Sequence, residues 1–83
     1  MSLPLYKDVV LQKDIPEENL QAGDIGTVVE RHEVADLETG YSVEFFDMLG
    51  RTVALITVPE SWLRVPQNGD RPTIRKEAIP TVG

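Results

Sequence analysis

Residues 23–30 read Gly-Asp-Ile-Gly-Thr-Val-Val-Glu, and they are the most informative part of the chain about its fold. Gly23 and Gly26 supply backbone freedom that residues with a Cβ atom lack. The β-branched residues at 27–29 favour an extended, half-buried backbone. The stretch therefore predicts a tight turn that runs directly into a long strand. Gly26 allows that strand to bend, or lets another backbone approach it closely.

Strand signals continue on both sides of this stretch. Residues 41–46 alternate with a period of two, which places Tyr41, Val43 and Phe45 on one face. Residues 51–58 carry apolar side chains at both parities, so we expect this strand to be buried on both faces for part of its length. In total, we expect strands over residues 6–11, 24–33, 41–46, 51–58 and 63–65.

Turn signals separate these strands. Residues 16–18 begin with proline, which suits the first position of a single helical turn. Gly40 is available for a positive φ in the connection that precedes the third strand. Asp47 and Gly50 occupy the first and last positions of a type I turn. Residues 60–62 suit a short 3₁₀ turn after the fourth strand.

The order of elements is a strand, a long loop, a three-strand meander, a 3₁₀ turn and a short strand. This order is typical of an SH3-like barrel. We therefore predict an all-β fold, a small SH3-like five-stranded barrel over residues 1–66. Residues 67–83 form a C-terminal extension, which we expect to dock along a strand edge of its own or a neighbouring barrel. A chain of 83 residues makes one domain at most.

Charge and composition exclude several classes of function. The net charge is −6, with −7 in residues 1–66 and +1 in residues 67–83. Because an acidic body repels phosphate at long range, we do not expect nucleic-acid binding. The chain has no cysteine and a single histidine, which is a poor ligand set for zinc. We expect a cytoplasmic protein, with no signal peptide, no membrane partner and no cofactor.

With these motifs in place, the chain resembles a known family. The motifs that carry the resemblance are Asp-Val-Val-Leu at 8–11, the opening stretch at 23–30, Tyr-Ser-Val-Glu-Phe at 41–45 and Gly-Arg-Thr-Val-Ala-Leu-Ile-Thr-Val at 50–58. The family consists of small bacterial proteins, common in cyanobacteria, described only as a domain of unknown function. The resemblance covers residues 5–66 and implies an SH3-like barrel without an established activity.

Catalytic residues are not expected. His32 with Glu30 or Glu33 could form a base and its orienting carboxylate, but that face at a hairpin end is usually solvated. Asp47 is expected to form its turn and not to act in catalysis. Enzyme chemistry needs a nucleophile or an acid–base pair held in a pocket, and the sequence offers no further candidate. We therefore predict that the chain is not an enzyme.

Four acidic residues border the loop before the second strand. Carboxylates in such a loop can hold a hard cation, since calcium prefers several oxygen ligands. Their spacing matches no calcium-binding loop, so we predict a solvated acidic rim and no metal site. The four residues are Asp14, Glu17, Glu18 and Asp24.

Two apolar features suggest protein contacts. Phe46 should point outward beside Met48 and Leu49, which occupy a turn tip that normally favours polar residues. Trp62 either lies in the core under the 3₁₀ turn or lines a binding groove, and tryptophan is enriched in binding hot spots. The tail adds two apolar patches. The predicted interface residues are Phe46, Met48, Leu49, Trp62, Ile74 and Ile79.

These features lead to one main hypothesis and two alternatives. The main hypothesis is a non-catalytic protein–protein interaction or assembly module that self-associates into a homo-oligomer. The first alternative is an accessory or regulatory subunit that binds one specific protein. The second is an RNA- or ribosome-associated domain of the KOW type, which rests on fold analogy alone.

Overall fold

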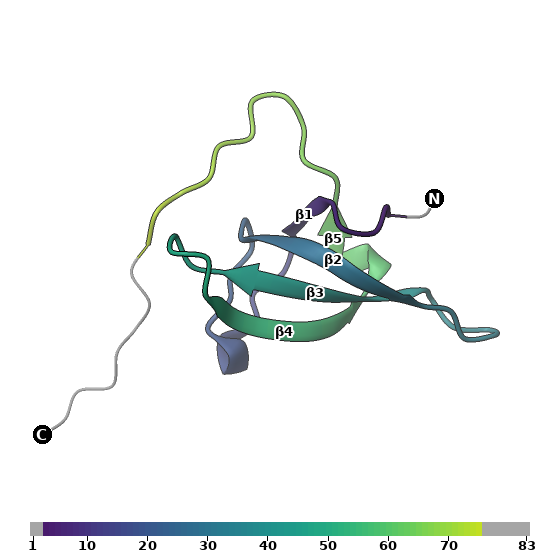
Figure 1. Ribbon diagram of the computed structural model, residues 1–83. Coiled ribbons are helices and arrows are strands. Elements are labelled where there is room, and N and C mark those ends of the chain that lie inside the picture. The colour runs from purple at the N-terminus through teal and green to yellow at the C-terminus, as the bar shows by residue number, and fades with distance from the viewer. Residues whose placement is uncertain (1–2, 76–83) are drawn as a thin grey trace, which may run out of the picture.

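The computed structural model describes residues 3–75 of the chain (Figure 1). The all-β prediction is confirmed, since this part of the chain forms a five-stranded antiparallel sheet with two 3₁₀ turns and no α-helix. None of its helical segments is long and apolar enough to cross a membrane. The elements are β1 (Asp8–Leu11), η1 (Pro16–Glu18), β2 (Ile25–His32), β3 (Gly40–Phe46), β4 (Thr52–Pro59), η2 (Glu60–Trp62) and β5 (Leu63–Arg64).

The strands lie in the order β4-β3-β2-β1-β5, so sequence neighbours pair from β1 to β4 (Figure 1). The short β5 returns to pair with β1, where Leu63 lies opposite Leu11. Two register shifts bend the meander, one between Val28 and Glu30 of β2 and one between Phe45 and Phe46 of β3. Within residues 3–75, β4 and β5 are the edge strands.

The core lies on one face of the sheet. The alternation in β3 buries Tyr41, Val43 and Phe45, as the sequence pattern predicts. Ile15 and Leu20 pair through an isolated bridge and close the loop around η1 over the same core. The other members of the cluster come from β1, β2, β4, β5 and the N-terminal arm: Val9, Leu11, Val28, Ala54, Val58, Leu63 and Leu3.

Gly26 is a point of close approach between β2 and β3. A Cβ atom built at this position would lie 2.5 Å from Val43 Cγ1 and 3.0 Å from both the Glu44 carbonyl oxygen and Phe45 Cε1. No side chain fits there without moving the core face of β3. Of the two roles the sequence allows for Gly26, close approach is thus confirmed.

Two local predictions are wrong. The β4 strand is not buried on both faces, because Leu55 is 60% exposed and only Ala54 and Val58 are buried. Within residues 3–75 the sheet is a single layer, and Val53 and Leu55 on the other face of β4 are exposed, so apolar residues at both parities did not mean two-sided burial. Gly40 does not adopt a positive φ but begins β3, and the hairpin turn uses Asp36, with φ of 65°, instead.

The chain leaves the sheet after β5 and runs without regular secondary structure to residue 75 (Figure 1). A turn at residues 67–70 starts this segment. Two nitrogens of the Arg64 guanidinium donate to the Asp70 carboxylate at 2.8 and 2.9 Å, and the Gln67 N–H donates to it at 2.6 Å. The described part of the tail, up to Arg75, therefore adds no strand to the sheet.

Candidate functional site

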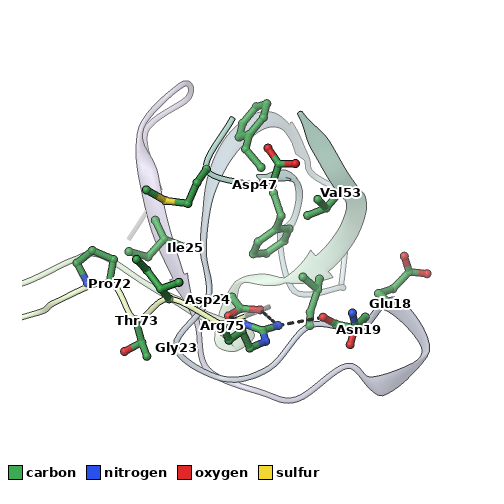
Figure 2. A pocket seen from close by; sticks show the side chains of 15 residues that line it. Glu18, Asn19, Gly23, Asp24, Ile25, Asp47, Val53, Pro72, Thr73 and Arg75 are labelled. Carbon is green, nitrogen blue, oxygen red and sulfur yellow. Dashed lines mark hydrogen bonds and ion pairs between the residues drawn. The ribbon is translucent and has the colours of Figure 1, made fainter. Parts of the chain in front are cut away.

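A groove of about 430 Å³ lies between the loop before β2, the end of β3 with its turn, and the tail (Figure 2). Its apolar lining comes from elements that are distant in sequence. Ile25 comes from β2 and Val53 from β4, while Pro72 and Thr73 come from the tail. The lining also includes Leu20, Phe45, Phe46, Met48 and Ile74.

Two features of β3 and the following turn direct side chains into this groove. The alternation of β3 places Phe46 on the outer side of the sheet, where it is partly exposed, and the register shift beside it leaves Val53 of β4 as an extra residue. The turn from Asp47 to Gly50 is closed by a hydrogen bond from Gly50 N–H to the Asp47 carbonyl oxygen. The Asp47 carboxylate accepts the N–H groups of Leu49 and Arg51, both at 2.9 Å. The turn tip is therefore held in one shape, with Met48 beside the groove.

An arginine-binding notch closes one end of the groove. Both outer nitrogens of the Arg75 guanidinium donate to the Asp24 carboxylate, and Nη2 also donates to the Asn19 carbonyl oxygen at 2.9 Å (Figure 2). The Gln21 N–H donates to Asp24 Oδ2 at 3.0 Å and orients the carboxylate. The hydrogen bonds to Asp24 raise the pKa of Arg75 above its ordinary value. Two charge-assisted hydrogen bonds between Arg75 and Asp24 thus hold the tail against the body.

The groove gathers only part of the predicted interface. Phe46, Met48 and Ile74 line it, and Met48 and Ile74 are 83% and 80% exposed. Leu49 is 79% exposed on the same turn, but it is not part of the groove lining. Ile79 lies outside the described residues.

Trp62 lies in η2, away from the groove. Its side chain is half-buried against the hydrophobic core, and the ammonium group of Lys13 stands 5.3 Å from the ring centroid. A cation over a tryptophan face is a favourable contact at the surface. Of the two readings of Trp62, its packing therefore favours the core.

A second polar cluster occupies the outer face of β2, β3 and β4. His32 Nε2 lies 2.8 Å from Ser42 Oγ, and Ser42 Oγ lies 2.9 Å from Thr57 Oγ1. Glu30 Oε1 lies 3.8 Å from the same Nε2 atom of His32. In a catalytic triad the nucleophile and the carboxylate bond different ring nitrogens of the histidine. Here Ser42 and Glu30 both lie near Nε2 of His32, so this arrangement does not orient a base toward a nucleophile. The cluster is a cross-strand ladder on an open face.

The acidic loop uses two of its carboxylates as internal acceptors. Asp14 Oδ1 accepts the Ala22 N–H at 2.9 Å, and Asp24 is occupied by Arg75 and Gln21. In the described part of the chain, no group of three or more acidic or histidine side chains is placed to hold a metal ion. The residues present therefore fit hydrogen-bonded loop closure better than cation binding.

Sequence reasoning placed Asp24 in a solvated acidic rim and missed its pairing with Arg75, in which the Asp24 side chain is only 15% exposed. The two residues lie 51 positions apart, and no local pattern joins them. Ser42 was missed for the same reason, since its partners come from two other strands. The one available signal for the notch was the change of net charge from −7 to +1 at the start of the tail.

Comparisons with known proteins agree with the motifs on the strands. No curated protein and no solved structure matches the chain. The model of one family, described as a domain of unknown function (DUF4926), matches residues 5–65, which include all five strands. The match covers most of the chain, and it ends where the tail begins. The chain therefore belongs to the DUF4926 family.

Proposed function

We propose that the chain is a non-catalytic protein–protein interaction module that self-associates through the groove. The observation that carries this proposal is the gathering of exposed apolar side chains from three distant segments, with Ile25, Phe46, Met48 and Ile74 facing one hollow. An apolar centre with a polar rim is typical of a contact surface. Here Asp24 and Arg75 supply polar groups at its rim.

The proposal also includes the type of fold that the sheet forms. We propose that the curved sheet is an SH3-like barrel over residues 1–66, with the tail as a separate extension. Its support is the pairing of β1 with both β2 and β5, and the 3₁₀ turn η2 directly before β5. Barrels of this class act mainly as binding modules, which is an argument from fold alone.

A second copy is the proposed occupant of the groove. The groove is small, so it suits a weak contact well below the area of a permanent dimer. The tail, which forms one wall, belongs to the segment with net charge +1, while the body carries −7. Two copies therefore present complementary charges around matching apolar surfaces. We place this assembly in the cytoplasm, as the composition suggests.

Sedimentation velocity across micromolar concentrations tests the proposal with a matched pair of variants. Met48→Gln removes an apolar side chain from the groove lining, and Leu49→Asn removes an equally exposed neighbour outside it. We expect Met48→Gln to weaken self-association by roughly five- to thirtyfold, because burying such a side chain contributes about 1–2 kcal/mol. Leu49→Asn should leave it unchanged.

Two outcomes would contradict self-association through the groove. A wild-type chain that stays monomeric at all concentrations would exclude self-association. Equal effects of the two variants would show that the contact does not depend on the groove. A monomer that forms a stable complex with one protein of its host would instead favour the accessory-subunit alternative.

A further inference from the structure

The notch that holds Arg75 is a built arginine-binding site. Asp24 presents both carboxylate oxygens to the guanidinium group, and the Asn19 carbonyl oxygen supplies a third acceptor. The Asp24 side chain is 15% exposed and is already oriented by the Gln21 N–H. A planar fork with two parallel donors matches this arrangement, whereas an ammonium group would satisfy only part of it.

The segment that supplies the arginine is otherwise loosely attached to its own body. Among the described residues, the hydrogen bonds from segment 71–75 to the body all come from the Arg75 side chain. Ile74 beside it lines the groove and remains 80% exposed. The turn at residues 67–70, which precedes this segment, is held to β5 separately, by the pair of Arg64 and Asp70. Among the described residues, the hydrogen bonds to the body that detaching this segment breaks are therefore those of Arg75 alone.

We infer that the Arg75 segment of one copy binds the Asp24 notch of a second copy, in a reciprocal exchange of tails. This inference rests on the proposed self-association and names the segment that carries it. The notch already binds Arg75 of its own chain. Arg75 of a second copy can make the same hydrogen bonds to Asp24. Exchange of an identical element is a common route to dimers, because only the hinge changes conformation. The exchanged form also brings two bodies together, so that each can cover the apolar groove of the other.

Complementary charge reversal tests the exchange directly. Asp24→Arg and Arg75→Asp each place like charges at the notch, so neither variant should exchange tails with itself. In an equimolar mixture both notches of a mixed dimer carry opposite charges. The two variants differ in mass, so native mass spectrometry of the mixed full-length chains separates the mixed dimer from both homodimers. We expect the mixed dimer to exceed random 1:2:1 pairing by about tenfold.

Three controls keep this test interpretable. The double variant Asp24→Arg/Arg75→Asp restores opposite charges within one chain and should dimerise like the wild type. Arg71→Asp changes the charge of the same tail away from the notch, and its mixture with Asp24→Arg should show no excess. Asp24→Asn mixed with Arg75→Gln repeats the experiment with smaller changes, since asparagine can still accept the Gln21 N–H.

The outcomes separate this inference from the proposed function. Dimers that form in a 1:2:1 ratio would overturn tail exchange while leaving self-association through the groove intact. Wild-type chains that form no dimer would overturn both. A mixed-dimer excess that Met48→Gln also weakens would support both together.

Discussion

Tyr41 donates a hydrogen bond to Glu60 from a side chain that is completely buried, with 3.1 Å between its hydroxyl oxygen and Oε1. The same hydroxyl accepts the Leu3 N–H at 2.9 Å. One atom at the start of β3 thus joins the N-terminal arm to the turn before β5. We expect Tyr41→Phe to lower the free energy of unfolding by about 1–3 kcal/mol, because it leaves a buried N–H without its acceptor.

Urea unfolding of Tyr41→Phe measures this cost. Glu60→Gln serves as the control, since its amide oxygen can still accept from Tyr41 and its effect should be smaller. A Tyr41→Phe variant as stable as the wild type would show that the two hydrogen bonds of the hydroxyl add nothing to the free energy of unfolding.

Gly26→Ala should destabilise the sheet by about 1–3 kcal/mol, because its methyl group overlaps the packed core. The methyl group would meet Val43 Cγ1 at 2.5 Å. Gly40→Ala is the matched control, since its nearest neighbour would be the Val58 carbonyl oxygen at 3.7 Å. Thermal unfolding compares the two variants. Equal melting temperatures would contradict the close approach at Gly26.

The pair of Arg64 and Asp70 predicts a pH dependence. Hydrogen bonds from the Arg64 guanidinium and from the Gln67 N–H lower the pKa of Asp70 from 3.8 to about 2. Because this pKa is depressed in the folded chain, the pair stabilises the turn above about pH 4, and the contribution is lost as the pH falls toward 2. The side chains are partly exposed, so we expect a small effect on stability and a clear effect on titration.

An NMR titration of the Asp70 carboxyl carbon checks this prediction. The midpoint should lie near 2 in the wild type and should rise toward 3.8 in Arg64→Gln. Arg71→Gln, which removes another arginine of the same segment, should leave the midpoint in place. An unchanged midpoint in Arg64→Gln would show that Arg64 does not lower the pKa of Asp70.

Asp47→Ala should loosen the turn tip and cost about 1 kcal/mol, because the N–H groups of Leu49 and Arg51 lose their acceptor. It should also weaken self-association, since Met48 would lose its fixed position beside the groove. Asp47→Asn retains an acceptor oxygen and should restore most of both properties. Denaturation and sedimentation of the same samples link the two effects.

The strands and turns of the sheet could be predicted from the sequence because the signals for them lie within short segments. Alternation in residues 41–46 and the turn chemistry of Asp47 and Gly50 act within a few residues, and both predictions are confirmed. The error at β4 arose because apolar side chains on a strand do not reveal how many layers cover the sheet. Leu55 is exposed because no second layer covers it within the described residues.

The candidate site was predicted only in part, since it depends on tertiary contacts. The outward direction of Phe46 follows from counting along the strand, and it is confirmed. The meeting of Phe46 with Ile74, and of Asp24 with Arg75, depends on the path of the tail across the body. No periodicity encodes that path.

The outer edge of β4 bears on whether association stops at small assemblies. Within residues 3–75 no strand pairs with this edge, which leaves backbone groups available for fibre-like growth. Two features shorten the part of β4 with which another strand could pair. Pro59 at its end has no N–H, and the shift that pairs Phe46 with Thr52 leaves Val53 as an extra residue near its start. The straight part is only a few residues long, so this edge is a short template for open-ended growth.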